Sequence, residues 1–196
     1  MSKSGRTRQY IIEKTAPVFN AKGYSGTSLS DLIEATGLTK GSIYGNFENK
    51  DEVAIAAFDY NFGNITALIR DRIREKDTAI EKLLVYPQTH RNLLKIPFLK
   101  AGCPLLNTSV DADDTHPLLR ERAVKALNLW RSSIVKIIEH GIQTKEIRKD
   151  TNPTAFAAIL ISLTEGAVMQ AKVTGKPAEL NITMDFLEKM IRDLER

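Results

Sequence analysis

Apolar residues recur at helical spacing along almost the whole of this 196-residue chain, and this periodicity limits the possible folds more than any other feature. Apolar residues at i, i+3, i+4 and i+7 form one stripe along a helix, whereas a half-buried strand alternates apolar and polar residues. Ile12, Ala16 and Phe19 follow the helical spacing, as do the apolar residues between 54 and 69. No segment has the alternating pattern of strands joined by hairpin turns. We therefore predict an all-α protein of about nine helices.

Capping residues and glycines set the ends that we expect for these helices. Ser28 with Asp31, and Thr78 with Glu81, have the spacing of a capping box, and Gly37 is placed to stop the helix that Ser28 begins. The expected helices cover 8–22, 28–37, 39–47, a long stretch from 49, 78 to an end or bend at 87, a stretch from 104, 117–144, a stretch from 152 and one capped by Asn181, with irregular segments at 95–102 and 111–114.

Pro17 lies inside the first expected helix. A proline in a helix interior removes a backbone donor and costs about 3 kcal/mol. We expect a kink or a tightened turn at this point, because the apolar stripe continues on both sides of the proline.

The positive charge of the chain is concentrated near its N-terminus. Residues 1–50 contain seven Lys and Arg against four Asp and Glu, whereas the remaining 146 residues contain 21 against 20. This asymmetry has two interpretations: a solvated basic segment, or a segment that faces a polyanion such as nucleic acid. The sequence features described next favour the second.

Several other classes of protein have no support in the sequence. No uninterrupted apolar run approaches the ~20 residues of a membrane span, and the N-terminus has no secretory apolar stretch, so we expect a cytoplasmic protein without a membrane partner. The single Cys103 cannot form an internal disulfide. His90, His116 and His140 lack the spacing of metal ligands. No nucleophile elbow, phosphate loop or paired-carboxylate signature occurs, so we expect no catalytic residues, no metal, no cofactor and no enzymatic activity.

The second and third expected helices have the spacing of a helix-turn-helix. Only Leu38 separates Gly37, which ends the second helix, from Thr39, the expected N-cap of the third. A helix that enters the major groove of DNA must be short and must carry small residues at its leading end. The sequence Thr39-Lys40-Gly41-Ser42 meets this requirement, with Ile43 and Phe47 expected to face the core.

Residues 8–58 resemble the DNA-binding domain of the tetracycline-repressor (TetR) family of transcriptional regulators. The resemblance rests on Ile11-Ile12-x3-Ala16-x2-Phe19-x3-Gly23-Tyr24-x2-Thr27-Ser28-x3-Leu32-Ile33-x3-Gly37-Leu38-Thr39-Lys40-Gly41-Ser42-Ile43-Tyr44-x2-Phe47-x2-Lys50-Asp51-Glu52. Further on, Gly102-Cys103-Pro104-Leu105-Leu106-Asn107 and Gly141-x5-Ile147-Arg148-x-Asp150-x2-Pro153 are similar to segments of the same family. The match implies an N-terminal helix-turn-helix domain over 1–48 and a helical effector-binding and dimerisation domain over 49–196.

Within this motif we assign DNA contacts by side-chain chemistry. Lys40 and Ser42 are expected to reach base edges, and Asn46 to pair with adenine. Hydroxyl groups, a lysine and helix-terminal amides bind phosphate oxygens. The complete predicted DNA-binding set is Thr27, Ser28, Thr39, Lys40, Gly41, Ser42, Tyr44, Asn46 and Lys50, with Arg6 and Arg8 expected to reach along the backbone or into the minor groove.

The resemblance also implies an effector cavity among the fifth to eighth helices and a dimer through the last two. Each aromatic residue in this region has packing as an alternative role, and Glu165 has two: an anchor in the cavity, or an ion pair or cap at the dimer interface. The expected effector-binding residues are Tyr86, His90, Phe98, Cys103, Asn107, Trp130, Phe156, Glu165 and Met169. The expected dimer-interface residues are Ile161, Leu187, Met190, Ile191 and Leu194.

These features together predict a ligand-responsive DNA-binding repressor. It would bind a palindromic operator in double-stranded DNA as a homodimer, and a small apolar or amphipathic effector would release it. The alternative is a helical carrier or sequestering protein that has the cavity but no operator preference.

Overall fold

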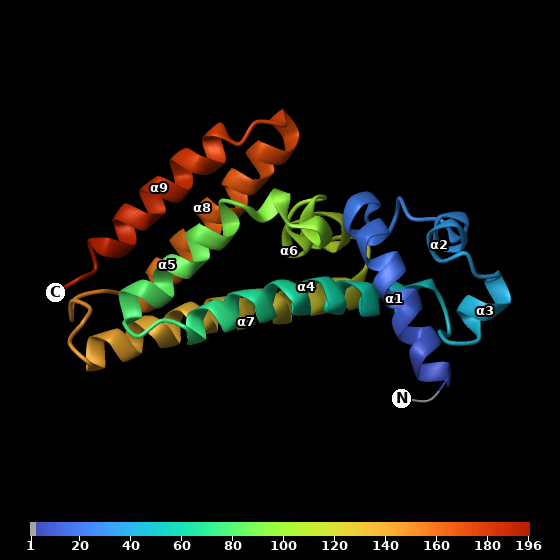
Figure 1. Ribbon diagram of the computed structural model, residues 1–196, viewed down its shortest axis with the longest axis horizontal. Helices are drawn as coiled ribbons and strands as arrows, with labels where there is room; N and C mark the ends of the chain where they lie inside the picture. The colour runs from blue at the N-terminus through green and yellow to red at the C-terminus, as the bar shows by residue number, and fades with distance from the viewer. Residues whose placement is uncertain (1–2) are drawn as a thin grey trace. The chain divides into compact units, whose positions relative to one another are not determined.

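The computed structural model describes residues 3–196, and these residues form nine α-helices and no β-strand (Figure 1). This result confirms the predicted all-α class. The helices are α1 (Lys3–Lys22), α2 (Leu29–Thr36), α3 (Lys40–Tyr44), α4 (Lys50–Arg74), α5 (Ala79–His90), α6 (Pro104–Ala112), α7 (Pro117–Gln143), α8 (Pro153–Thr174) and α9 (Ala178–Arg192). Two short 3-10 turns, Leu93–Lys95 and Pro97–Leu99, lie between α5 and α6.

The caps expected from the sequence form. Ser28 and Asp31 make both hydrogen bonds of a capping box at α2, and Thr78 and Glu81 do the same at α5. Thr39 caps α3 by accepting a hydrogen bond from the Ser42 backbone. These helix starts were predictable because each cap joins residues only three positions apart.

Several expected boundaries are wrong. α1 begins at Lys3 instead of Arg8 and continues through Pro17 to Lys22. α3 ends at Tyr44, three residues early, and the chain then leaves the helix before Phe47 enters the core. Asn181 does not cap the last helix but lies inside it, because α9 begins directly after Pro177.

Two further helix-end predictions differ from the structure. Pro87 does not end α5, which extends to His90. Asp111 and Ala112, expected in a loop, form the last turn of α6. In each case the helix continues because tertiary packing stabilises turns that local propensity disfavours.

The described residues divide into two compact units. The first consists of the chain up to Asn64 together with Ala101–Ala126. In it α1 packs on α2 and α6, and α2 packs on α3. Ile11, Leu32 and Ile43 have no exposed surface. The helix-turn-helix therefore belongs to a unit that also contains α6, while the predicted domain boundary at residue 48 stays a prediction.

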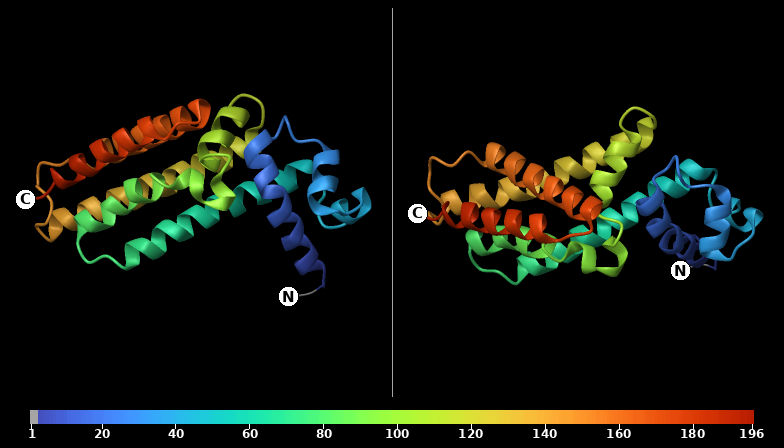
Figure 2. Two further views of the ribbon diagram at one scale, coloured as in Figure 1. Left: turned by 45° about the horizontal axis from the view of Figure 1, so that its top comes forward. Right: turned by 90° about the horizontal axis from the view of Figure 1, so that it is seen from above.

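The second unit consists of Ile65–Lys100 and Leu127–Arg196. Here α5 packs against both α8 and α9, and α8 and α9 lie side by side in both views of Figure 2. By length and composition α8 is the one described helix that could cross a membrane. Its packing against α9 and α5 accounts for this apolar character, because a helix that buries more than one side needs apolar residues around most of its circumference.

Gly141 in α7 lies at a close contact of the second unit. An added Cβ would come within 2.7 Å of the Ala79 Cβ and 2.7 Å of the Ile147 Cδ1. We expect Gly141→Ala to lower the free energy of unfolding by about 1–3 kcal/mol, because overpacking forces neighbouring atoms apart. Urea denaturation measures this change. The matched control is Gly63→Ala in α4, where an added Cβ has no neighbour within 4 Å and the expected change is a gain of up to about 1 kcal/mol. Equal effects at the two glycines would contradict the packing argument.

His90 is a buried ionisable group of the second unit. Burial lowers the pKa of its imidazole to about 4, whereas an unfolded histidine has a pKa of about 6.5. As pH falls from about 6.5 to 4 the unfolded chain binds a proton that the folded chain excludes, so the free energy of unfolding should fall by up to about 3 kcal/mol. His90→Phe should remove this component. The difference between wild-type and variant urea unfolding at several pH values isolates it, and parallel pH profiles would refute the assignment.

Candidate nucleic-acid interface and effector region

The turn between α2 and α3 depends on the backbone of Gly37. This residue has φ +67°, in the left-handed region that favours glycine, and its N–H donates to the Ile33 carbonyl at 2.8 Å. Thr39 then caps α3. Only Leu38 lies between Gly37, which ends α2, and Thr39, which caps α3, as the spacing predicted.

α3 presents small and basic groups on one side and anchors itself on the other. Thr39, Lys40, Gly41 and Ser42 are exposed, and Tyr44 is half-buried. Ile43 is completely buried, which confirms its predicted position in the core. The leading end of the helix is therefore free of bulky side chains and open to a partner.

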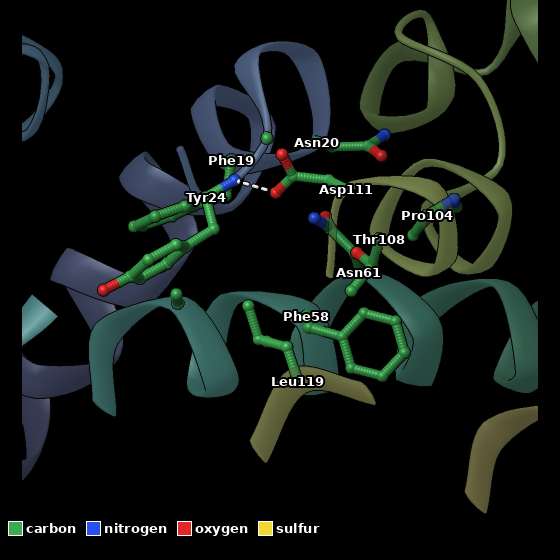
Figure 3. Close-up of a pocket in the computed structure, with 11 residues that line it drawn as sticks. Phe19, Asn20, Tyr24, Phe58, Asn61, Pro104, Thr108, Asp111 and Leu119 are labelled. Carbon is green, nitrogen blue, oxygen red and sulfur yellow. Dashed lines mark hydrogen bonds between the residues drawn. The ribbon is translucent and has the colours of Figure 1, made fainter. Parts of the chain in front are cut away.

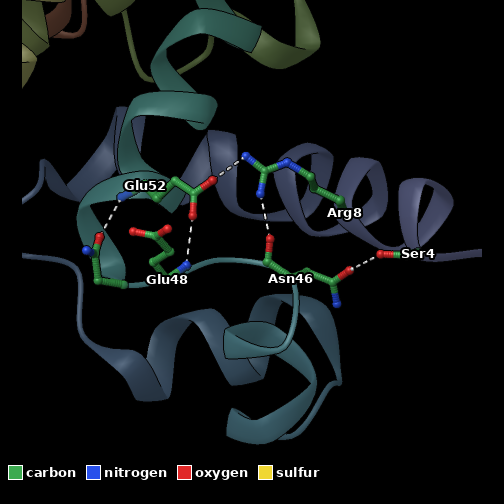
Figure 4. A network of polar contacts seen from close by, with 6 residues as sticks. Ser4, Arg8, Asn46, Glu48 and Glu52 are labelled. Atoms are coloured by element: carbon green, nitrogen blue, oxygen red, sulfur yellow. Dashed lines mark hydrogen bonds and ion pairs between the residues drawn. The ribbon is translucent and has the colours of Figure 1, made fainter.

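Arg8 holds the end of α3 against the start of α4 (Figure 4). Its guanidinium donates to the Asn46 carbonyl at 2.6 Å and to the Glu52 carboxylate at 2.7 Å, and it lies 4.0 Å from the centre of the Phe47 ring. Two of the five guanidinium N–H donors of Arg8 are thus used within the unit, and its contact with DNA stays a prediction. We call this group, Arg8 with Asn46, Phe47 and Glu52, the arginine clamp.

Glu52 completes the clamp on the other side. Its second carboxylate oxygen accepts the Glu48 N–H at 2.7 Å, and this hydrogen bond, followed by Arg8, lowers the pKa of Glu52. Asn49 accepts the Glu52 N–H at 2.9 Å and so caps α4 as predicted. The connection between α3 and α4 is thus fixed by both backbone and side-chain groups.

Two further predicted DNA contacts have partners within the protein. Thr27 is 1% exposed, and its hydroxyl donates to the Gly23 carbonyl at 2.6 Å, so its side chain does not face a phosphate; this corrects the prediction. The Asn46 amide donates to the Ser42 carbonyl at 2.9 Å and accepts from Ser4 at 3.3 Å. One N–H and one oxygen lone pair of the amide remain outside these two bonds.

Lys50 lies at the start of α4 beside Tyr24. Its ammonium is 4.2 Å from the centre of the Tyr24 ring, and the Tyr24 hydroxyl donates to Asp51. That hydrogen bond to a carboxylate raises the pKa of Tyr24 to about 12. The Tyr24 ring lies against the ammonium of Lys50, whose side chain is half-exposed. Ser28 at the start of α2 is exposed, as is Arg6 in α1.

α6 is joined to the end of α1 within the first unit by contacts that the sequence did not predict (Figure 3). Asp111 accepts the Tyr24 N–H at 2.6 Å, and its carboxylate lies 2.8 Å from the place of a Cβ on Gly23. Asn61 of α4, whose amide donates to the Ala16 carbonyl at 2.8 Å, lines the same small cavity of about 20 Å³. The sequence signal that was available is Gly23 itself, which has φ +71° and permits the close approach.

Asn107 belongs to this junction as well. Its amide nitrogen donates to the Asn20 carbonyl at 3.0 Å and to the Asn20 side-chain oxygen at 2.9 Å, while Asn20 donates to the Gly102 carbonyl at 3.1 Å. Asn107 therefore links α6 to α1, a role that differs from the effector contact expected of it.

Three of the predicted effector-binding residues come together in the second unit. The His90 and Trp130 rings stack in parallel with centroids 5.4 Å apart, and the Tyr86 carbonyl lies 2.8 Å from His90 Nδ1. Phe156 is buried, Phe98 and Glu165 are half-buried, Met169 is exposed, and Cys103 is buried in the first unit. The effector assignment of all nine residues stays a prediction.

Most of the predicted dimer-interface residues lie inside their own protomer. Leu187 and Ile191 have no exposed surface, Ile161 and Leu194 are also buried, and Met190 is half-buried. The four buried side chains therefore pack within the single chain, and their assignment to a dimer interface stays a prediction. The exposed apolar residues of α8 and α9 are Ile159, Met169, Val173, Ile182 and Phe186.

Comparison with known proteins gives one consistent result. Residues 11–57 match the family described as bacterial regulatory proteins, tetR family, and residues 79–187 match the tetracyclin repressor-like C-terminal domain. A TetR-family transcriptional regulator from Cytophaga hutchinsonii is 49% identical, with a TM-score of 0.91 over 100% of this chain and 98% of that one. The HTH-type transcriptional repressor DhaR of Mycobacterium sp. (strain GP1) is 26% identical over 181 residues, 91% of this chain and 90% of its own.

A more distant structure shares the fold. The transcriptional regulator FadR of Bacillus subtilis, in complex with stearoyl-CoA, is 22% identical with a TM-score of 0.76 over 93% of this chain and 96% of that one. The family matches together cover more than half of the chain. This protein belongs to the TetR family of DNA-binding transcriptional regulators.

Proposed function

We propose that this protein is a repressor that binds an inverted-repeat operator as a homodimer and is released by a small apolar or amphipathic effector. The observation that carries this proposal is the exposed edge of α3 from Thr39 to Ser42, held by the arginine clamp behind it. A rigid support matters because base contacts are productive only when the donors stay in register with the groove.

The contacts follow from the exposure of each group. Lys40 and Ser42 contact base edges, with Thr39 and Gly41 allowing the helix to approach closely. Ser28, Tyr44 and Lys50 contact phosphates, and Asn46 offers its remaining N–H and lone pair to a base. Thr27 contributes through the fold of the turn that precedes α2.

The dimer contact uses exposed apolar residues of the last two helices. Val173 is 81% exposed, Ile182 68% and Phe186 57%, so α8 and α9 carry several large apolar side chains on their surface, and exposed apolar residues that form a contiguous patch mark interaction sites. A two-fold contact presents the same surface twice and so pairs two copies of α3. An inverted-repeat operator follows from that symmetry.

Two observations support the effector part of the proposal. Tyr86, His90 and Trp130 come together in the second unit, and one relative has a bound ligand. FadR of Bacillus subtilis has been crystallised with stearoyl-CoA, an amphipathic ligand. An effector lowers operator affinity only if it binds the released conformation more tightly than the DNA-bound one. This mechanism needs no catalysis, and a cytoplasmic location is part of the proposal. The carrier alternative is not favoured, because both domains match regulators.

Selection of bound sequences from random DNA duplexes tests the operator proposal. The purified protein should enrich an inverted repeat, and fluorescence anisotropy should give a higher affinity for this repeat than for scrambled DNA. Retention of random and selected duplexes with equal affinity would favour the carrier alternative.

Lys40→Ala and Lys50→Ala should affect DNA binding in different ways. Removal of the base contact at Lys40 should relax sequence preference at one position of each half-site by about 1–3 kcal/mol. Removal of the phosphate contact at Lys50 should weaken binding to all sequences equally and reduce the slope of log affinity against log salt by about 1 per half-site. Anisotropy titrations at several salt concentrations compare the two variants. An unchanged slope for Lys50→Ala, or an unchanged consensus for Lys40→Ala, would contradict the assignment concerned.

Phe186→Glu should disrupt the homodimer, because it places a charge in an apolar contact. Leu129→Glu in α7 is the matched control, since Leu129 is 64% exposed and lies outside α8 and α9. Sedimentation velocity should give a dimer for the wild type and the control, and a monomer for Phe186→Glu. A dimer in all three would place the interface elsewhere.

A further inference from the structure

Trp130 in α7 carries a buried donor that the described residues leave unused. The residue is 7% exposed, and its indole Nε1 has no hydrogen-bond partner among them. Nearly all buried donors in native proteins are bonded, and the exceptions need an explanation. The indole nitrogen can only donate, so the missing partner must be an acceptor.

The residues connected to Trp130 by ring stacking and hydrogen bonds are uncharged. His90 stacks on the indole with an angle of 4° between the rings, and its Nδ1 lies 2.8 Å from the Tyr86 carbonyl, so Nδ1 carries the proton. Burial lowers the pKa of His90 to about 4, which keeps the ring neutral. The Tyr86 hydroxyl donates to Ser133 at 2.9 Å and is already used.

This cluster of Trp130, His90, Tyr86 and Ser133 therefore combines flat aromatic surfaces with one unused donor. An anion would be buried here without a cation from any of the four residues, and such burial is costly. A cation has no lone pair for the indole N–H. A neutral molecule with an acceptor oxygen satisfies the donor at no electrostatic cost.

We propose that Trp130 is the hydrogen-bonding anchor of the effector site, and that the effector is an uncharged, largely apolar compound with a carbonyl oxygen, such as a ketone or an ester. This inference rests on the proposed function, in that it names the chemistry of the effector. A hydrocarbon of the same shape would bury the same area but leave the indole N–H unpaired, so the site discriminates between the two.

The chain offers a direct reporter, because Trp130 is its only tryptophan. In the ¹⁵N-labelled full-length protein the indole N–H gives a single signal. The probes are cyclohexanone, 1-tetralone and 2-undecanone, each compared with the hydrocarbon of the same skeleton. We expect at least one ketone to move the indole signal downfield and to bind about 5–10-fold more tightly than its hydrocarbon.

An isosteric replacement separates the hydrogen bond from packing. Biosynthetic exchange of the single tryptophan for benzothienylalanine puts sulfur in place of the N–H and keeps the ring shape. It should reduce the ketone preference to about 1-fold, as measured by calorimetry, because the donor is gone. Leu129→Ala in α7 is the control and should retain the preference, since Leu129 is 64% exposed and does not belong to the cluster.

Three outcomes would overturn the proposal: no ketone shifts the indole signal, ketone and hydrocarbon bind equally, or the benzothienylalanine protein keeps the preference. Operator binding is measured on the same samples by anisotropy. Normal operator binding without ketone preference refutes this inference alone, whereas ketone preference without operator binding refutes the proposed function and leaves the anchor in place.

Discussion

The packing of a five-residue helix, α3, is the condition on which the rest of the proposed DNA-facing surface depends. A helix of this length has no stability of its own in water, because it makes too few backbone hydrogen bonds to offset nucleation. Its geometry comes instead from the burial of Ile43 and Phe47 and from the arginine clamp. The exposed residues of α3 can then remain small and polar, since none of them has to hold the helix in position.

The same compact unit connects this surface to α6. Asp111 holds the Gly23–Tyr24 turn, and Asn107 and Asn20 hold the end of α1. The contact between Asp111 and the turn has little room for adjustment, because the Asp111 carboxylate lies 2.8 Å from the place of a Cβ on Gly23. Any displacement of α6 relative to α1 must break or re-form these hydrogen bonds. The first unit therefore joins the proposed recognition helix to α6, which constrains the end of α1.

In the second unit the apolar residues serve two purposes. Leu187 and Ile191 of α9 fill the core, whereas Phe186 and Ile182 of the same helix remain on the surface. The core residues account for the stability of the protomer, and the surface residues account for the proposed association. The stacked His90 and Trp130 rings add a third feature, a neutral polar group within an apolar region.

The sequence by itself determined the helical class, most helix starts and the helix-turn-helix, because these depend on caps, glycines and apolar spacing within a few residues of one another. It also identified the family, since the motif has many residue types at fixed offsets. Only the tertiary structure decided which polar side chains are used internally. Arg8 and Asn46 are 38 residues apart, and Asn107 and Asn20 are 87 apart. An arginine or asparagine has the same chemistry in solvent and in a clamp, so its partner is set by which distant backbone groups the fold brings within hydrogen-bonding reach. The buried and exposed apolar residues of α8 and α9 could not be separated from the sequence for the same reason: both are apolar, and packing alone decides which side of a helix is covered.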